Sequence, residues 1–296
     1  MNELTNFLPY IVFIIGLMIG SFLNVVIYRL PVMMYRDWRK ECIEFLELAP
    51  EAVPHPEKLE RLHLTPEEPF NLVLPFSRCS SCKTPIKPNQ NIPVLSYVFL
   101  KAKCAHCGAR ISWRYPSIEL LTAILSSLVA LKYGYSLQTL FALFLTWSLI
   151  ALTFIDIDHH LLPDSINLPV LWLGLFLSLF GLFTDAHSSI IGAVAGYGSL
   201  WIVYHLFKLV TGKEGMGFGD FKLLALFGAW LGWQSLPLII ILSSLAGASF
   251  GIASIILAKR DHTVPIPFGP YLAIAGWVAL MWGESLNRLY LASFSL

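Results

Sequence analysis

Residues 137–158 read LQTLFALFLTWSLIALTFIDID, an apolar run that ends in two aspartates. No charged residue interrupts the run before Asp156, and its length is close to the roughly 20 helical residues that cross a bilayer core. The whole chain has the same character, since 56% of its residues are hydrophobic and only 13% are charged, against about 25% in soluble domains. We therefore predict a membrane protein with carboxylates at the boundary of one span.

Seven more apolar windows predict further spans, at residues 8–27, 118–131, 166–183, 190–210, 221–233, 236–258 and 271–290. The expected fold class is an all-α polytopic membrane protein with about eight transmembrane helices. The windows at 118–131 and 221–233 are short, so they must recruit flanking residues or end inside the bundle. The first window is too long for a signal-peptide core, and we expect it to be retained.

Basic residues predict the orientation of these spans. With eight spans, the Lys- and Arg-rich segments 31–114, 208–222 and 259–262 fall on one side, whereas the opposite loops contain one lysine. The positive-inside rule makes the basic side cytoplasmic. Residues 1–30 then form the first transmembrane helix, residues 31–114 form a cytosolic insertion, and residues 115–296 form the main transmembrane domain.

The insertion contains two cysteine pairs, Cys79-Ser-Ser-Cys82 and Cys104-Ala-His-Cys107. Two residues between the cysteines of each pair suit a turn that directs both thiolates to one ion, and two such turns complete a tetrahedral site for Zn²⁺. Disulfides do not persist in the cytosol, so we favour structural zinc over disulfides or a redox pair. His106 is an alternative ligand, although four sulfurs suffice.

The second half of the insertion is basic, because residues 69–118 contain several lysines and arginines but no aspartate or glutamate. A basic zinc segment can indicate nucleic-acid binding. This segment is tethered to a membrane, however, and anionic lipid explains its cations with fewer assumptions. We expect Lys101, Lys103, Arg110 and Arg114 to contact lipid, and we expect no nucleic-acid partner.

Aspartates at span boundaries are the candidate catalytic groups. Asp156, Asp158 and Asp164 end one span, and Asp220 follows Gly217-Phe-Gly at the head of another. Gly-x-Gly permits unusual backbone geometry and close approach of another chain. Two close carboxylates share one proton, so one can activate water while the other protonates a peptide carbonyl. An ion-coupled transporter stays open as an alternative, although its charges are expected nearer mid-bilayer.

The order of motifs along the chain resembles that of bacterial type IV prepilin peptidases that are also N-methyltransferases. The resemblance covers nearly the whole chain and rests on six matches: GSFLNVVIYRLP at 20–31, the two cysteine pairs, SWRYP at 112–116 with Glu119, DIDHHLLPD at 156–164, GFGD at 217–220 with Lys222, and PFGP at 267–270.

The resemblance implies two reactions in the bacterial inner membrane. The family cleaves the leader of prepilins or pseudopilins after a glycine at the cytoplasmic face, then methylates the new N-terminal residue, usually phenylalanine, with S-adenosylmethionine. Its catalytic aspartates correspond to Asp156 and Asp220, with Asp158 as the alternative to Asp156. Residues 31–114 become a zinc-binding domain associated with methyl transfer, and residues 115–296 a GxGD aspartyl peptidase domain.

The methyl-donor site is the least defined part of this hypothesis. Its contacts are expected between Gly20 and Arg114, but the sequence has no glycine-rich nucleotide loop of the Rossmann type to identify them. A protein with peptidase activity alone is therefore a second alternative.

Overall fold

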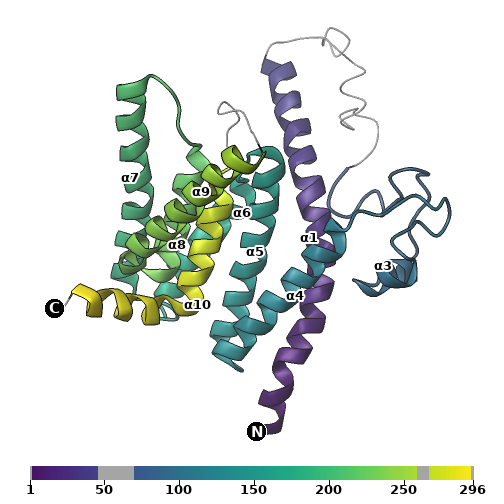
Figure 1. Ribbon diagram of the computed structural model, residues 1–296, viewed down its shortest axis with the longest axis horizontal. Coiled ribbons are helices and arrows are strands. Elements are labelled where there is room, and N and C mark those ends of the chain that lie inside the picture. The colour runs from purple at the N-terminus through teal and green to yellow at the C-terminus, as the bar shows by residue number, and fades with distance from the viewer. Residues whose placement is uncertain (1, 46–69, 259–266, 295–296) are drawn as a thin grey trace. The chain divides into compact units, whose positions relative to one another are not determined.

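The computed structural model describes residues 2–45, 70–258 and 267–294, and these residues form a helical protein (Figure 1). Extended pairing within them is limited to two isolated bridges, Arg78 with Pro85 and Lys103 with Arg110. The all-α fold class is therefore confirmed. The chain divides into two compact units, Met1–Leu128 and Val129–Leu296, which are described separately below.

Each predicted window coincides with a helix. The eight helices are α1 (Asn2–Phe45), α4 (Arg114–Tyr133), α5 (Leu137–His159), α6 (Asp164–Ser178), α7 (Ala186–Thr211), α8 (Phe218–Leu231), α9 (Leu236–Ala258) and α10 (Gly269–Phe294). Short elements complete the described chain: η2 (Pro88–Gln90), α3 (Leu95–Phe99) and η3 (Trp233–Ser235). Among the described residues, five segments are long and apolar enough to cross a membrane, in α1, α4, α5, α7 and the η3–α9 region.

Helix α1 extends beyond the expected end of the first span at residue 30 and continues to Phe45. Pro31 lies inside it, although a proline in a helix interior removes a hydrogen bond and costs about 3 kcal/mol. Contacts on both sides of Pro31 offset this cost: Arg29 donates to the carbonyls of Asn71 and Pro75, and Arg36 lies over the Phe70 ring. The predicted insertion therefore begins inside a continuous helix.

In the first unit, α1 and α4 cross at two glycines. A Cβ atom on Gly16 would lie 2.6 Å from the Cα of Ala123, and one on Gly20 would lie 2.6 Å from the Cα of Glu119. Glycines four residues apart allow membrane helices to approach this closely. Asn24 adds a polar link by donating to the carbonyl of Tyr115 at 3.2 Å.

Helix α8 is the central element of the second unit. It packs against α7 and α6, contacts α10, and is buried from Asp220 to Trp230 except at Lys222. Because α8 has only 14 residues, it is shorter than a bilayer-spanning helix, but the surrounding helices provide protein contacts for it. At its crossing with α7, a Cβ atom on Gly192 would lie 2.3 Å from the carbonyl oxygen of Gly228, so the two backbones are in contact.

Candidate active site and metal site

Asp156 lies in the last turn of α5 and is held by the start of α10. The backbone N–H of Gly269 donates to its Oδ2 atom at 3.1 Å. Helix α5 ends at His159, and the next residue, His160, has a left-handed conformation (φ 53°) and donates its N–H to the Asp156 carbonyl at 2.9 Å. The helix end and the Gly269 amide together fix the carboxylate in a buried position.

Asp220 is the third residue of α8 and is also buried. Its backbone N–H donates to the Gly217 carbonyl at 3.2 Å, and the positive end of the helix dipole favours a negative charge here. A Cβ atom on Gly219 would lie 2.8 Å from the Cβ of Leu162, so close approach at this glycine is confirmed. The backbone conformation that glycine permits is not used here, because Gly217 has an ordinary φ of −84° and Gly219 is helical.

The structure brings Asp156 and Asp220 together, and their charges interact. Leu162 connects the two helix ends, since its side chain lies against both Gly219 and Gly269. The two carboxylates are only 6% and 7% exposed, so water screens their repulsion weakly. Such a pair can hold one proton between two groups, which is the state needed to activate water and protonate a carbonyl.

The neighbouring aspartates lie outside this pair. Asp158 is exposed, because two residues further along a helix a side chain points to nearly the opposite face. Asp164 begins α6 and forms an ion pair with Lys222 of α8 at 2.6 Å. The geometry therefore favours Asp156 over the alternative Asp158, and it gives Asp164 and Lys222 a role in joining α6 to α8.

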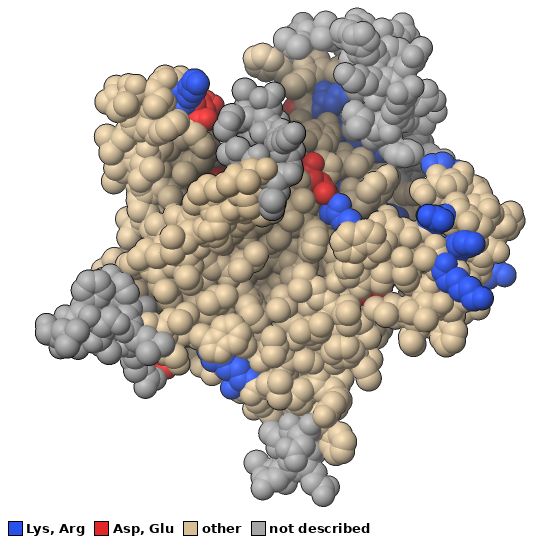
Figure 2. Space-filling view, viewed as in Figure 1, with Lys and Arg blue, Asp and Glu red and all other residues tan. Residues whose placement is uncertain are grey.

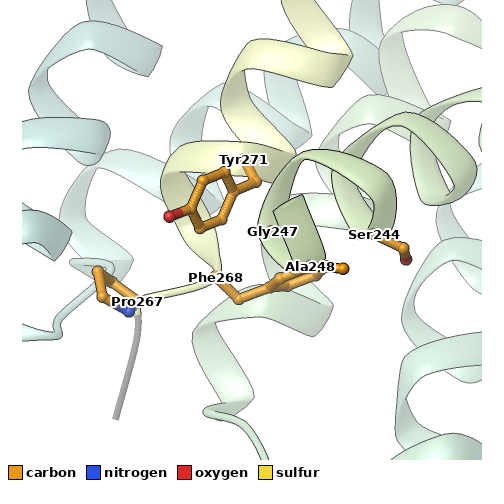
Figure 3. A pocket seen from close by; sticks show the side chains of 6 residues that line it. All are labelled: Ser244, Gly247, Ala248, Pro267, Phe268 and Tyr271. Atoms are coloured by element: carbon orange, nitrogen blue, oxygen red, sulfur yellow. The ribbon is translucent and has the colours of Figure 1, made fainter. Parts of the chain in front are cut away.

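An apolar groove adjoins the carboxylate pair. It has a volume of about 280 Å³ and is lined by Ser244, Gly247 and Ala248 of α9 and by Pro267, Phe268 and Tyr271 (Figure 3). Phe268, which lines the groove, directly precedes the glycine that holds Asp156.

Gly269 is the site residue whose role sequence reasoning missed. The PFGP motif at 267–270 was one of the six matches to the family, but the sequence indicated no contact for it. A glycine followed by a proline at the start of an apolar run is a helix-start signal, and that signal marks the position. Its partner Asp156 comes from a different helix and is recognisable only in the tertiary structure.

The four predicted cysteines form one cluster in the first unit. The sulfur atoms of Cys79, Cys82, Cys104 and Cys107 all lie within 4.8 Å of one another, and those of Cys79 and Cys107 are 3.8 Å apart. A tetrahedral zinc site with Zn–S bonds of about 2.3 Å requires sulfurs roughly 3.8 Å apart, so the cluster fits such an ion. His106 is not part of this group of four.

The two cysteine pairs have matching backbones. Cys79 donates its N–H to the Thr84 carbonyl, and Cys104 donates to that of Ala109. Lys83 and Gly108, which directly follow the pairs, have left-handed φ angles of 59° and 71°. These turns direct each pair of sulfurs to one point, as the spacing predicted. Hydrogen bonds with Thr84 lower the pKa of Cys82 to about 6, whereas burial and the three neighbouring cysteines raise the pKa of Cys107 to about 11.

A basic cavity of about 610 Å³ lies in the same unit. Its lining includes Lys101, Lys103 and Arg110 together with Tyr97 and Trp113. Figure 2 shows Lys and Arg side chains gathered on the visible surface of this region. Three of the four cations expected to contact lipid therefore lie around one cavity, immediately before α4.

The fold and these two sites define a helical membrane protein with a buried aspartate pair and a four-cysteine cluster that can hold a metal ion. The chain belongs to the type IV leader peptidase family. The model of that family matches residues 143–252, and the model of the bacterial peptidase A24 N-terminal domain matches residues 14–133.

Curated relatives extend this similarity over almost the full length. The prepilin leader peptidase/N-methyltransferase of Aeromonas hydrophila is 52% identical over 99% of this chain and 98% of its own. The proteins of the same description from Stutzerimonas stutzeri and Pseudomonas aeruginosa are each 53% identical, over 94% of this chain and 92% and 91% of their own. No solved structure matches the chain significantly.

Proposed function

We propose that this protein cleaves the leader peptide of type IV prepilins or pseudopilins and then N-methylates the new N-terminus. The observation that carries the proposal is the placement of two buried aspartates, Asp156 and Asp220, at ends of α5 and α8 that Leu162 connects, where their charges interact. Relatives more than 50% identical over nearly the full chain, all described as prepilin leader peptidase/N-methyltransferase, support both activities.

The aspartate pair suits hydrolysis of a peptide bond. The ionised member takes a proton from water as the water attacks the scissile carbonyl, and the protonated member donates to the carbonyl oxygen. The amide of Gly269 holds the carboxylate of Asp156, so this group does not have to be reoriented when the substrate arrives.

The location of the pair suits a substrate anchored in the membrane. We place the protein in the bacterial inner membrane with the pair at the cytoplasmic face, on the basis of the distribution of basic residues. A prepilin held by an apolar helix would present its scissile bond at that depth. The groove between α9 and Pro267–Tyr271 is apolar and adjoins the pair, so we assign to it the segment that follows the scissile bond.

The cofactors are assigned by the chemistry of the donors. Four thiolates in a closed set suit one structural Zn²⁺, which stabilises the cytosolic segment and leaves no position for a substrate. S-adenosylmethionine supplies the methyl group in the second reaction, and its contacts are assigned to residues 20–114. Lys101, Lys103, Arg110 and Arg114 are assigned to anionic lipid.

The test is to incubate the purified protein with a prepilin, with and without S-adenosylmethionine, and to measure product masses. Cleavage is expected in both samples, and the mass of one added methyl group only with the methyl donor. Asp156→Asn and Asp220→Asn should each abolish cleavage, whereas the matched control Asp158→Asn should retain it.

Three other results would change the proposed function. Substantial cleavage by either aspartate variant contradicts the assigned pair. An unmethylated product in the presence of the methyl donor reduces the function to peptidase alone. An unchanged prepilin mass together with ion-dependent flux in liposomes would favour the transporter.

A further inference from the structure

Glu119 is a buried carboxylate that the peptidase reaction does not use. It lies near the start of α4 and is 8% exposed. Its Oε2 atom accepts the backbone N–H of Val94 at 2.7 Å, and the Ser21 hydroxyl also interacts with it. Among the acids of Met1–Leu128 whose burial the structure describes, Glu119 is the one that is buried.

Three separate parts of the chain meet at this carboxylate, namely α1, the segment at Val94 and α4, and holding them together costs free energy. Val94 has a φ of 59° and a ψ of −47°, a conformation that a β-branched residue adopts only at a cost of about 1–3 kcal/mol. The backbone of α1 approaches so closely that Gly20 has no room for a side chain beside Glu119. Strained backbone and a buried charge held together in this way are typical of functional sites.

The charges of the surrounding segment suggest what this carboxylate recognises. Both partners of the proposed second reaction are cations, because the new α-amino group arrives as an ammonium and the methyl donor is a sulfonium. Residues 69–118 supply several lysines and arginines but no acid, so their side chains repel both partners. Glu119 is the adjoining group of opposite charge.

We infer that Glu119 binds the new α-amino group of the cleaved substrate and accepts its proton before N-methylation. The inference rests on the proposed function. A carboxylate has two oxygens with about four acceptor positions, and within the described part of the chain Val94 and Ser21 occupy two of them. Capacity for an ammonium group therefore remains.

The step balances in atoms and charge. A proton passes from the ammonium to a carboxylate oxygen of Glu119, which leaves a neutral amine. The nitrogen lone pair then forms the bond to the methyl carbon as the carbon–sulfur bond breaks, and that electron pair stays on sulfur as a neutral thioether. The product is a secondary ammonium, and Glu119 returns its proton to water after release.

The decisive variant is Glu119→Gln, assayed on a substrate whose leader has already been removed. Glutamine keeps the size and an oxygen that can accept the Val94 N–H, but it cannot carry charge or take the proton. Methylation should fall at least about 10²-fold, the usual loss when an acid–base group is removed. The exposed Glu44→Gln on α1 is the matched control and should methylate like the wild type.

Binding without the methyl donor gives an independent measurement. The wild-type protein should bind a processed pilin peptide with a free N-terminus more tightly than its N-acetylated form, and Glu119→Gln should lose that preference. Glu119→Asp, which retains the charge, should keep part of it. Zinc content measures whether each variant is folded.

Wild-type methylation by Glu119→Gln, or no preference of the wild type for the free amine, would overturn the inference. Loss of zinc from Glu119→Gln would also overturn it, because the carboxylate would then be an anchor for the zinc segment. A wild-type protein that cleaves but never methylates would remove the transferase half of the proposed function as well, so the two failures are distinguishable.

Discussion

Gly269→Ala tests how tightly the start of α10 holds the aspartate pair. A Cβ atom at this position would lie 2.6 Å from Oδ2 of Asp156 and 3.2 Å from Cδ2 of Leu162. Real Cβ contacts are essentially never under 3.0 Å, so the carboxylate must move by several tenths of an ångström. The same shift stretches the 3.1 Å hydrogen bond from the Gly269 amide.

Two effects determine how much cleavage activity Gly269→Ala should lose. A hydrogen bond to a charged group contributes about 1.5–3 kcal/mol, and misplacing a reacting group by about 1 Å costs roughly 10²-fold in rate. The second figure corresponds to about 2.7 kcal/mol of transition-state stabilisation. We therefore expect kcat/KM for prepilin cleavage to fall by roughly 10²-fold in Gly269→Ala.

The assay is the rate of leader loss from a prepilin, measured by mass under single-turnover conditions. Gly283→Ala on the same helix is the matched control, because its Cβ would have no neighbour closer than 3.9 Å, and it should cleave like the wild type. The reasoning is refuted if Gly269→Ala cleaves within about twofold of Gly283→Ala while both unfold at the same temperature.

Three further predictions concern metal, packing and substrate. Metal analysis should find about one zinc per chain, and Cys104→Ser should lower that content; unchanged zinc would contradict the four-sulfur site. Gly192→Ala should lower the unfolding free energy by about 1–3 kcal/mol because it strikes the Gly228 carbonyl, whereas Gly198→Ala, with open space at its Cβ, should not. Equal thermal melting of the two in detergent would be inconsistent with the α7–α8 crossing. Gly247→Leu should fill the groove and slow prepilin cleavage, and an unchanged rate would exclude the groove as the substrate path.

The sequence by itself determined the fold class, the positions of the helices and the cysteine cluster. All eight apolar windows became helices because hydropathy acts locally: a run without charges must satisfy its own backbone hydrogen bonds in lipid, and only a helix does so within one segment. The two Cys-x-x-Cys turns are also local, so their spacing alone predicted how each pair of sulfurs would be directed.

Only the tertiary structure decided which groups face one another. Asp156 and Asp158 are equivalent by composition and differ because helix rotation turns one toward Gly269 and Asp220 and the other to the surface. The extension of α1 past Pro31 likewise depends on contacts with residues 70–75.

The surroundings of Glu119 were likewise decided by the tertiary structure. Its motif was visible in the sequence, but its burial against Val94 and the close approach of α1 were not. Burial, hydrogen-bond partners and the proximity of two charges depend on segments that are distant in the chain, so they follow from packing and not from any local pattern.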